Sequence, residues 1–415
     1  MTRAHIIGAG LAGLSAAVEL AQKGVEIVLY EQATKAGGRA RSFHDSHLDR
    51  LIDNGNHLLL SGNYSALGFL QTINARQRLI GPGSARFDFA DLTTNDRWTI
   101  NFNRGPVPLW VLYEQSRVPG TSMMDYISGL KLLTAGNRSV ANLFGEQGQM
   151  YRRFWEPFSV AVLNTLPHEA VARLLLPVIK ETLAKGAEYS MPLVAREGLS
   201  DTFVDPALKW LERRKADILF GQRVTGFEHD GNKITAIKTA RSSEPVKAGD
   251  VVILATPAWV TPTLLENIPA PQAFAPIVNL HFQVDGFDGA KIETPILGLV
   301  GSPAHWLFVR GDIISVTISA AFDLADKPAK EIAAIIWPDV AKVYQLDGKT
   351  IPPVRVIKEQ RATFKTTPAE LERRPPAKTM YQNLTLAGDW TDTGLPATIE
   401  GAVRSGVTAV KALKL

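Results

Sequence analysis

Cysteine is absent from the 415-residue sequence. Its absence excludes disulfide bonds, thiolate metal sites and thiol redox chemistry. The chain also has no HExxH pattern or comparable spacing of histidines and carboxylates, so we predict no metal site. Dense basic blocks are missing too: 45 basic and 41 acidic residues give a net charge of only +4. Nucleic acid is therefore not an expected partner.

The sequence has no hydrophobic run suited to crossing a membrane. Its longest uncharged stretch, residues 267–284, contains Pro269, Pro271 and Pro276, which would break a spanning helix. The first expected strand begins at Ala4, which leaves no room for a signal peptide. We therefore expect a cytoplasmic protein. Its mildly basic surface would suit peripheral contact with the anionic inner face of a membrane.

A glycine pattern opens the chain. Residues 4–31 predict a strand, a turn, a helix and a second strand that ends at Glu31. This is the arrangement of a dinucleotide-binding motif, in which the helix N-terminus faces a pyrophosphate and the acid accepts from a ribose 2′-hydroxyl. The residues that we assign to this part of the site are Gly8, Gly10, Leu11, Ala12, Gly13, Glu31 and Gln32.

A second motif follows at once, with Gly37, Gly38 and Arg39 ahead of Ser42. Two glycines permit close backbone approach, and a guanidinium can fork onto a diphosphate. The pattern resembles the flavoprotein superfamily of amine oxidases, protoporphyrinogen oxidase and the carotenoid and phytoene desaturases. That resemblance implies FAD as the cofactor. Without cysteine the flavin cannot be tethered through a thiol, and we expect non-covalent FAD.

The same resemblance implies further cofactor contacts along the chain. The segment at 51–57 would pass beneath the flavin ring, and the backbone at Val224 would pair with the adenine. Asp389 would contact the ribityl-pyrophosphate chain, and the amides that start the last helix would point at N1 and O2 of the ring. The residues assigned on this basis are Gly55, Asn56, Val224, Gly388, Asp389, Thr398 and Ile399.

We expect an α/β protein with a Rossmann-like FAD-binding domain, built on a parallel sheet and interleaved with an α+β substrate domain, as in the amine oxidase and phytoene desaturase folds. Because strands are predicted near 250–257 and 384–391, the chain would return to the FAD domain twice. The FAD domain would then comprise residues 1–59, 201–258 and 379–415, and the substrate domain residues 60–200 and 259–378.

Within the substrate domain we predict a helical cap and an antiparallel sheet. The cap would contain helices near 124–133, 150–163 and 169–185. The strands at 278–284 and 313–318 alternate polar and apolar residues, so one face of the sheet would look toward a pocket.

Three further segments narrow the resemblance to one branch of this superfamily. The segments at 52–60, 153–157 and 388–406 are similar to the squalene-associated FAD-dependent desaturase branch, which includes bacterial hydroxysqualene dehydroxylases. This implies hydride transfer from reduced FAD to the allylic carbon of hydroxysqualene, giving squalene for hopanoid synthesis. Two alternatives stay open: a desaturase or amine oxidase working in the oxidising direction, and a non-catalytic prenyl-lipid binding protein. The sequence does not identify the electron donor.

Cleavage of a C–O bond favours a general acid, because hydroxide is a poor leaving group. His57 and Asp392 are the candidates, since both flank segments expected beside the ring. Each could instead orient the backbone or the flavin.

An isoprenoid lipid substrate would require the enzyme to reach a membrane surface. The run at 107–113, which contains Trp110 and lies between Arg104 and Arg117, is the candidate contact because aromatic residues suit a lipid interface. The same run could equally be a buried helix or strand.

Overall fold

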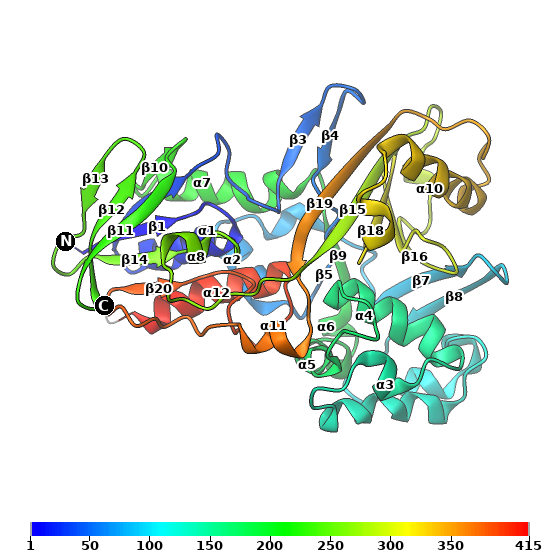
Figure 1. Ribbon diagram of the computed structural model, residues 1–415. Helices are drawn as coiled ribbons and strands as arrows, with labels where there is room; N and C mark the ends of the chain where they lie inside the picture. Colours follow the sequence, from blue (N-terminus) through cyan, green and yellow to red (C-terminus); the bar gives the residue numbers. More distant parts are fainter. Residues whose placement is uncertain (1, 414–415) are drawn as a thin grey trace.

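The computed structural model describes residues 2–413 and is built around two sheets (Figure 1). A five-stranded, wholly parallel sheet lies nearest the two termini. Its strands, in spatial order, are β10 (Asp217–Phe220), β2 (Glu26–Glu31), β1 (Arg3–Ile7), β14 (Val251–Leu254) and β20 (Leu384–Leu386). The chain therefore enters this sheet from three separate stretches, and the strand order is that of a doubly wound fold.

A seven-stranded sheet forms the other side of the molecule. Its order is β19 (Val354–Phe364), β15 (Phe274–Gln283), β18 (Ile313–Ser319), β17 (Trp306–Arg310), β16 (Ile296–Val300), β7 (Arg86–Asp91) and β8 (Asp96–Asn101). All neighbours are antiparallel except β16 and β7, so the sheet is mixed rather than fully antiparallel as predicted. The parallel pair arises because β7 reaches the sheet from a distant part of the chain.

Smaller strands and the helices complete the fold. The remaining strands are β3 (Ser42–Asp45), β4 (Arg50–Asp53), β5 (Leu59–Leu60), β6 (Leu79–Ile80), β9 (Pro192–Ala195), β11 (Val224–Asp230), β12 (Lys233–Thr239) and β13 (Ser243–Pro245). The helices are α1 (Leu11–Gln22), α2 (Tyr64–Thr72), α3 (Val140–Phe144), α4 (Glu156–Leu163), α5 (Leu175–Glu181), α6 (Ala187–Ser190), α7 (Asp205–Glu212), α8 (Thr261–Leu264), α9 (Phe322–Ala325), α10 (Ala329–Tyr344), α11 (Pro368–Glu372) and α12 (Ile399–Ala412). Four further turns of helix matter below: the 3-10 helices η2 (Leu109–Leu112) and η4 (Met123–Thr134), and the π-helical turns η5 (Tyr151–Trp155) and η8 (Ser200–Val204).

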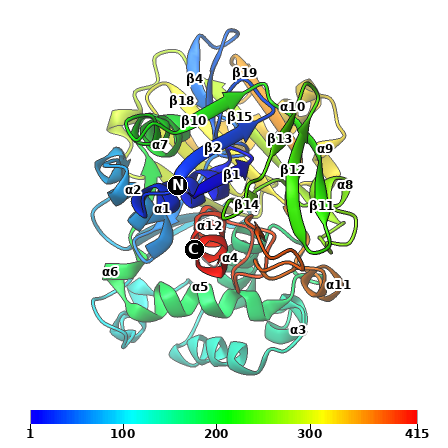
Figure 2. The ribbon, with the colours of Figure 1, turned by 90° about the vertical axis from the view of Figure 1, so that its left-hand side faces the viewer.

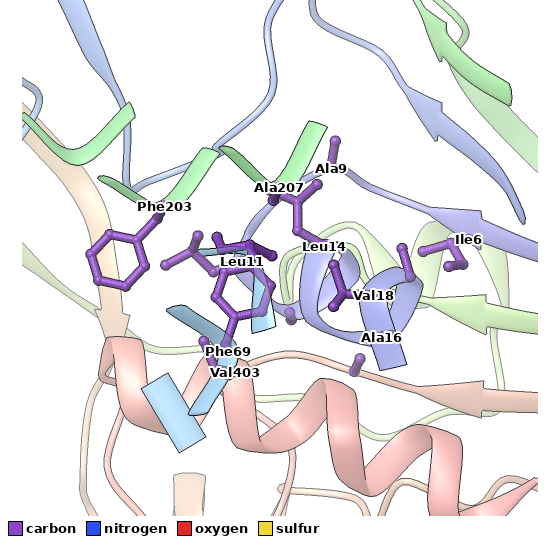
Figure 3. Close-up of a cluster of buried hydrophobic side chains, with 14 of the residues drawn as sticks. Ile6, Ala9, Leu11, Leu14, Ala16, Val18, Phe69, Phe203, Ala207 and Val403 are labelled. Carbon is purple, nitrogen blue, oxygen red and sulfur yellow. The ribbon is translucent and has the colours of Figure 1, made fainter. Parts of the chain in front are cut away.

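The core beneath the parallel sheet holds α1 against its neighbours (Figure 3). Leu14 and Val18 of α1 are buried, together with Phe69 of α2, Phe203 of η8 and Val403 of α12. Apolar side chains recur at helical spacing along α1, and Lys23 and Gly24 end the helix. This packing fixes the direction in which the N-terminus of α1 points.

Helices α1 and α12 lie side by side although their sequences are almost 400 residues apart (Figure 2). The contact is close enough that a Cβ at Gly406 would overlap the carbonyl oxygen of Ala12 and lie 2.8 Å from the Ala16 nitrogen. The Ser15 hydroxyl also donates to the carbonyl of Val403 at 2.9 Å. A small residue is thus required where the two helices cross.

The neighbouring strands β15 and β18 of the seven-stranded sheet each have two chemically different faces. Val278, Leu280 and Val316 are fully buried on the apolar face, in the cluster that includes Ile336 of α10. The opposite face carries the polar residues Asn279, His281, Ser315 and Thr317, which the alternation predicted. These polar residues are buried as well, so both faces of the sheet are covered.

A buried carboxylate anchors the helical region to the sheet. Asp91, at the end of β7, is fully buried and accepts from the guanidinium groups of Arg152 and Arg153 at 3.0 and 3.1 Å. Arg153 also lies over the ring of Trp98 at 5.3 Å. Arg153, which opens the motif at 153–157, and Arg152 before it therefore tie η5 to the β7–β8 hairpin.

Asn164 generates a first prediction. It adopts a left-handed conformation (φ 45°) at the end of α4, donates to the Ala275 carbonyl and the Thr363 hydroxyl, and accepts from the Ala320 amide. Asn164→Ala should lower the free energy of unfolding by about 2–4 kcal/mol, because buried backbone groups lose their partners. Denaturant unfolding of the purified protein measures this change.

Asn74 offers a matched control, since it has the same backbone conformation (φ 56°) after α2 but an exposed side chain. Asn74→Ala should cost about 1 kcal/mol, the backbone contribution alone. Equal losses in the two variants would show that the Asn164 side-chain bonds contribute nothing.

Candidate functional site

The turn after β1 admits only glycine at two positions. Gly8 has φ 108°, and a Cβ there would lie 2.6 Å from the carbonyl oxygen of Ala255. A Cβ at Gly13 would overlap the carbonyl oxygen of Gly8. The two glycines therefore let the strand turn sharply and let α1 pack close to it, as predicted from the sequence.

Gly10 has a different environment: nothing lies within 4 Å of the place a Cβ would occupy. It precedes α1 as the N-cap, and no side chain caps the helix. The first intrahelical bond runs from the Leu14 amide to the Gly10 carbonyl, so the amides of Leu11 and Ala12 remain available. Open space before an uncapped helix N-terminus fits the pyrophosphate of the expected dinucleotide.

The loop of the second motif closes over this turn. The Gly37 amide donates to the Ala9 carbonyl at 2.8 Å, and Gly38 lies beside the Cα of Gly10. Glu31 reaches the same turn, where its carboxylate accepts from the amides of Ala9 and Ala33, each at 2.9 Å. Each carboxylate oxygen keeps a lone pair for a further donor, so a ribose hydroxyl fits beside these bonds.

Gln32 and Val224 flank this acid. Gln32 is exposed, whereas Val224 is buried at the start of β11. The chain before Val224 passes along β2, because the Gln222 amide donates to the Glu31 carbonyl at 2.9 Å. The structure thus brings the residues predicted for the adenosine end into one neighbourhood.

Arg39 does not stand free. Its guanidinium donates to a carboxylate oxygen of Asp389 at 2.6 Å and also to the Ala362 carbonyl. Two residues that the sequence assigned separately to the cofactor therefore form an ion pair across 350 positions of sequence. A guanidinium has five donors, so this pairing leaves N–H groups for a diphosphate.

The C-terminal segment reaches the same place. The Gly388 amide donates to the Ser405 hydroxyl, and Trp390 is buried with its indole N–H bonded to the Thr256 carbonyl. Thr398 is the N-cap of α12, where its hydroxyl accepts from the Gly401 amide at 3.0 Å. The Ile399 amide at the next position is one of the groups that a helix start leaves for a ligand.

The segment at 53–57 packs against the polar face of the seven-stranded sheet. Asn56 donates to the Thr317 hydroxyl at 3.0 Å, and that hydroxyl donates to the Asn279 side chain at 2.9 Å. The Asn279 amide returns to the Asn54 carbonyl at 3.4 Å, and it would lie 3.3 Å from a Cβ at Gly55. A closed polar network thus joins the segment expected beneath the flavin to the substrate side.

Asn279 and Thr317 were not among the residues predicted from the sequence. The alternation of polar and apolar residues in strands 278–284 and 313–318 indicates that one face of the sheet is polar. It does not indicate which segment packs against that face. The fold shows that the loop at 53–57 is the segment that packs against this face of β15 and β18.

The two candidates for the general acid lie in different environments. The ring of His57 is half-buried and makes no hydrogen bond within the described residues. Burial lowers the pKa of His57, with the charge of Arg39 acting in the same direction and that of Asp53 opposing it. Asp392 is exposed, and its carboxylate accepts from the Gly394 amide in a surface turn. Of the two, only His57 is partly buried.

Asp53 itself is a positioning group. Its buried carboxylate accepts from the Ser42 hydroxyl, the Leu199 amide and the Arg310 guanidinium. These contacts hold β4 against η8 and β17, so the loop that follows has a fixed start. This role was not predicted from the sequence.

Glu31 generates the second prediction. Glu31→Gln should weaken FAD binding roughly 10–100-fold, because a charge-assisted hydrogen bond is worth about 1.5–3 kcal/mol. Titration of the apoprotein with FAD measures the affinity. Glu26→Gln, at the other end of the same strand, should bind FAD like the parent. Parental affinity in the Glu31 variant would refute the adenosine assignment.

His281 generates the third prediction. It is fully buried, its Nδ1 contacts the Ser315 hydroxyl at 2.8 Å, and burial lowers its pKa from 6.5 to about 4. Between these two values the unfolded chain binds a proton that the folded protein does not. The free energy of unfolding should therefore fall as the pH drops from about 6.5 to about 4.

His281→Asn keeps a polar atom near Ser315 and should flatten this acid limb in unfolding experiments run across that pH range. His47→Asn, at an exposed site, should leave the pH profile unchanged. A profile unaltered by His281→Asn would contradict the assigned cause.

Comparison with known proteins places the chain in a family. The family described as "Flavin containing amine oxidoreductase" matches residues 11–414. A hydroxysqualene dehydroxylase of Zymomonas mobilis is 43% identical over 410 residues, covering 99% of this chain and 98% of that protein. A 15-cis-phytoene desaturase of Synechococcus elongatus is 23% identical, covering 99% and 95%.

Among solved structures, an oxidoreductase from Methanosarcina mazei superposes with a TM-score of 0.74 at 14% identity, covering 99% of this chain and all of that one. That likeness confirms the predicted fold class of a parallel FAD-binding sheet combined with a second sheet. FAD is the cofactor, and the protein is an FAD-dependent oxidoreductase. The chain belongs to the flavin-containing amine oxidoreductase family and, within it, to the hydroxysqualene dehydroxylases.

Proposed function

We propose that this protein reduces hydroxysqualene to squalene in the synthesis of squalene and hopanoids. The observation that supports this most strongly is the 43% identity to a hydroxysqualene dehydroxylase over 99% of the chain. Reduced FAD, when bound, supplies the hydride that replaces the allylic hydroxyl. The rest of the task belongs to the protein: to orient the alcohol, to exclude water and to deliver one proton so that the hydroxyl leaves as water.

We assign the proton delivery to His57. Burial lowers the pKa of His57, so the ring in its protonated form is a stronger acid than a free imidazolium and can donate to the departing hydroxyl. The Asn56–Thr317–Asn279 network holds the backbone at Asn56 in place. The next residue is His57, so the position of its imidazole ring is restricted as well. Asp392 lies at an exposed turn, and we assign it a structural role in the loop that leads into α12.

The substrate is an isoprenoid lipid, in keeping with the relatives named above. We propose that the substrate domain comprises residues 60–200 and 259–378, and that the FAD domain comprises residues 1–59, 201–258 and 379–415. We also propose that the protein works in the cytoplasm at the inner face of a membrane, where its substrate is dissolved. Among the residues that the structure describes, no helix is both long enough and apolar enough to cross a bilayer.

Anaerobic incubation of the reduced holoenzyme with hydroxysqualene tests the reaction. Squalene should form in an amount equal to the flavin that is reoxidised, as measured by mass spectrometry and flavin absorbance. Two results would contradict the proposal. One is a flavin that stays reduced in the presence of hydroxysqualene. The other is an oxidised enzyme that is bleached by phytoene or by simple amines.

The assignment of His57 gives the fourth prediction. His57→Asn should lower kcat by about 10²-fold or more, the range of general acid catalysis, while FAD content stays at the parental level. Asp392→Asn is the paired variant and should keep most of the activity. The reverse result, with activity lost only at Asp392, would overturn the assignment of the acid.

A further inference from the structure

Exposed apolar side chains gather in one short part of the chain. Eighteen large apolar side chains are exposed within the described residues, and nine of them lie between 107 and 133, roughly one-fifteenth of the chain. The nine are Val107, Leu109, Leu112, Tyr113, Met123, Met124, Ile127, Leu130 and Leu133. Such a concentration marks an interaction site, whereas single exposed apolar residues do not.

The longest of the 3-10 helices explains the pattern. A 3-10 helix repeats every three residues, so its side chains fall into three straight rows. One row of η4 consists of Met124, Ile127, Leu130 and Leu133, with 71%, 50%, 63% and 59% of each residue exposed. We call this row the apolar ridge; at about 2 Å rise per residue it is about 18 Å long.

The second row of η4 faces the protein from Tyr126 onward, after the exposed Met123. The Tyr126 ring packs on Trp110 at 5.1 Å, Gly129 lies against Trp155, and Leu132 is buried. The third row is polar and includes Lys131. Because one row already packs inward, the apolar ridge is directed away from the protein and has no partner in the described chain.

Of the two alternatives for the run at 107–113, burial holds for Trp110. Trp110 is buried between Phe102 and Tyr126, whereas Leu109 and Leu112 beside it are about half exposed. The indole forms part of the support under the exposed surface. That support continues inward, since the same aromatic cluster includes Trp306 of β17, the strand that pairs with β18 at Thr317.

The charges around the ridge indicate its partner. Between residues 104 and 138 the chain carries four basic residues and two acidic ones, so this short region has half of the net charge of the protein. Arg104, Lys131 and Arg138 are exposed. An apolar row that projects beside exposed cations matches an anionic bilayer, where acyl chains meet negatively charged headgroups.

We infer that the apolar ridge of η4, with Leu109, Leu112 and Tyr113 beside it, enters the surface of an anionic lipid bilayer. The inference rests on the proposed function in one respect: a lipid substrate is dissolved in the bilayer, so the enzyme must bind the bilayer to obtain it. Contact is peripheral, and the inner row of η4 connects it to the aromatic cluster leading toward β17 and β18.

Flotation of the intact holoenzyme with vesicles of phosphatidylcholine, with and without phosphatidylglycerol, tests the inference. The parent should float with the anionic vesicles. Ile127→Ser combined with Leu130→Ser should lower the partition coefficient by about tenfold or more, because two apolar side chains no longer enter the bilayer. FAD content and melting temperature should stay unchanged, since both residues are exposed.

Ile351→Ser combined with Met380→Ser is the matched control, because these exposed apolar residues lie outside the ridge; it should float like the parent. Lys131→Gln with Arg138→Gln should weaken binding only to anionic vesicles. The inference is overturned if the ridge variant floats like the parent. It is equally overturned if the ridge variant only dissociates a dimer in sedimentation, which would make a second copy the occupant.

Turnover separates this inference from the proposed function. The ridge variant should convert hydroxysqualene dispersed in detergent at the parental rate and lose turnover only when the substrate is held in vesicles. A parent protein that floats but forms no squalene in either medium would refute the proposed function and leave the docking surface standing.

Discussion

The close crossing of α1 and α12 is the constraint on which the flavin site depends. At Gly406 there is no room for a side chain, so the last helix lies directly on the backbone of the first. The crossing joins the helix that begins uncapped after Gly10 to the helix that begins after Thr398. A site assembled from both ends of the chain forms only when this contact forms, and the Arg39–Asp389 ion pair joins the same two ends.

The site combines two kinds of surface. The side formed by the parallel sheet offers backbone amides and open space at Gly10, which suit a ligand rich in phosphate oxygens. The side formed by the seven-stranded sheet offers a buried polar face, on which Asn279 and Thr317 hold the loop before His57. Burial lowers the pKa values of His57 and His281, which marks this side of the site as poor in water. Such an interior shields a hydride transfer from water.

Local patterns predicted much of this arrangement, and tertiary contacts decided the rest. The turn at Gly8 and the acid Glu31 were predictable because strand, turn and helix are consecutive in sequence. The pairing of Arg39 with Asp389 was not, since no short-range pattern records a contact between distant loops. The segment at 124–133 was predicted to be helical without its type, because apolar residues at intervals of three or four fit more than one helix. The sequence left Trp110 equally open to a lipid interface and to the core, and contacts with Phe102 and Tyr126 place it in the core.

The most direct measurement of the central constraint compares two glycines in helices. Replacing an interior helical glycine by alanine ordinarily stabilises a helix by about 1 kcal/mol. Gly68→Ala in α2, where nothing lies within 4 Å of the new Cβ, should show that gain and keep its FAD. Gly406→Ala should instead lower both the unfolding free energy and the affinity for FAD, because the methyl group separates α12 from α1. A Gly406 variant that is as stable as the parent and binds FAD as tightly would contradict the account.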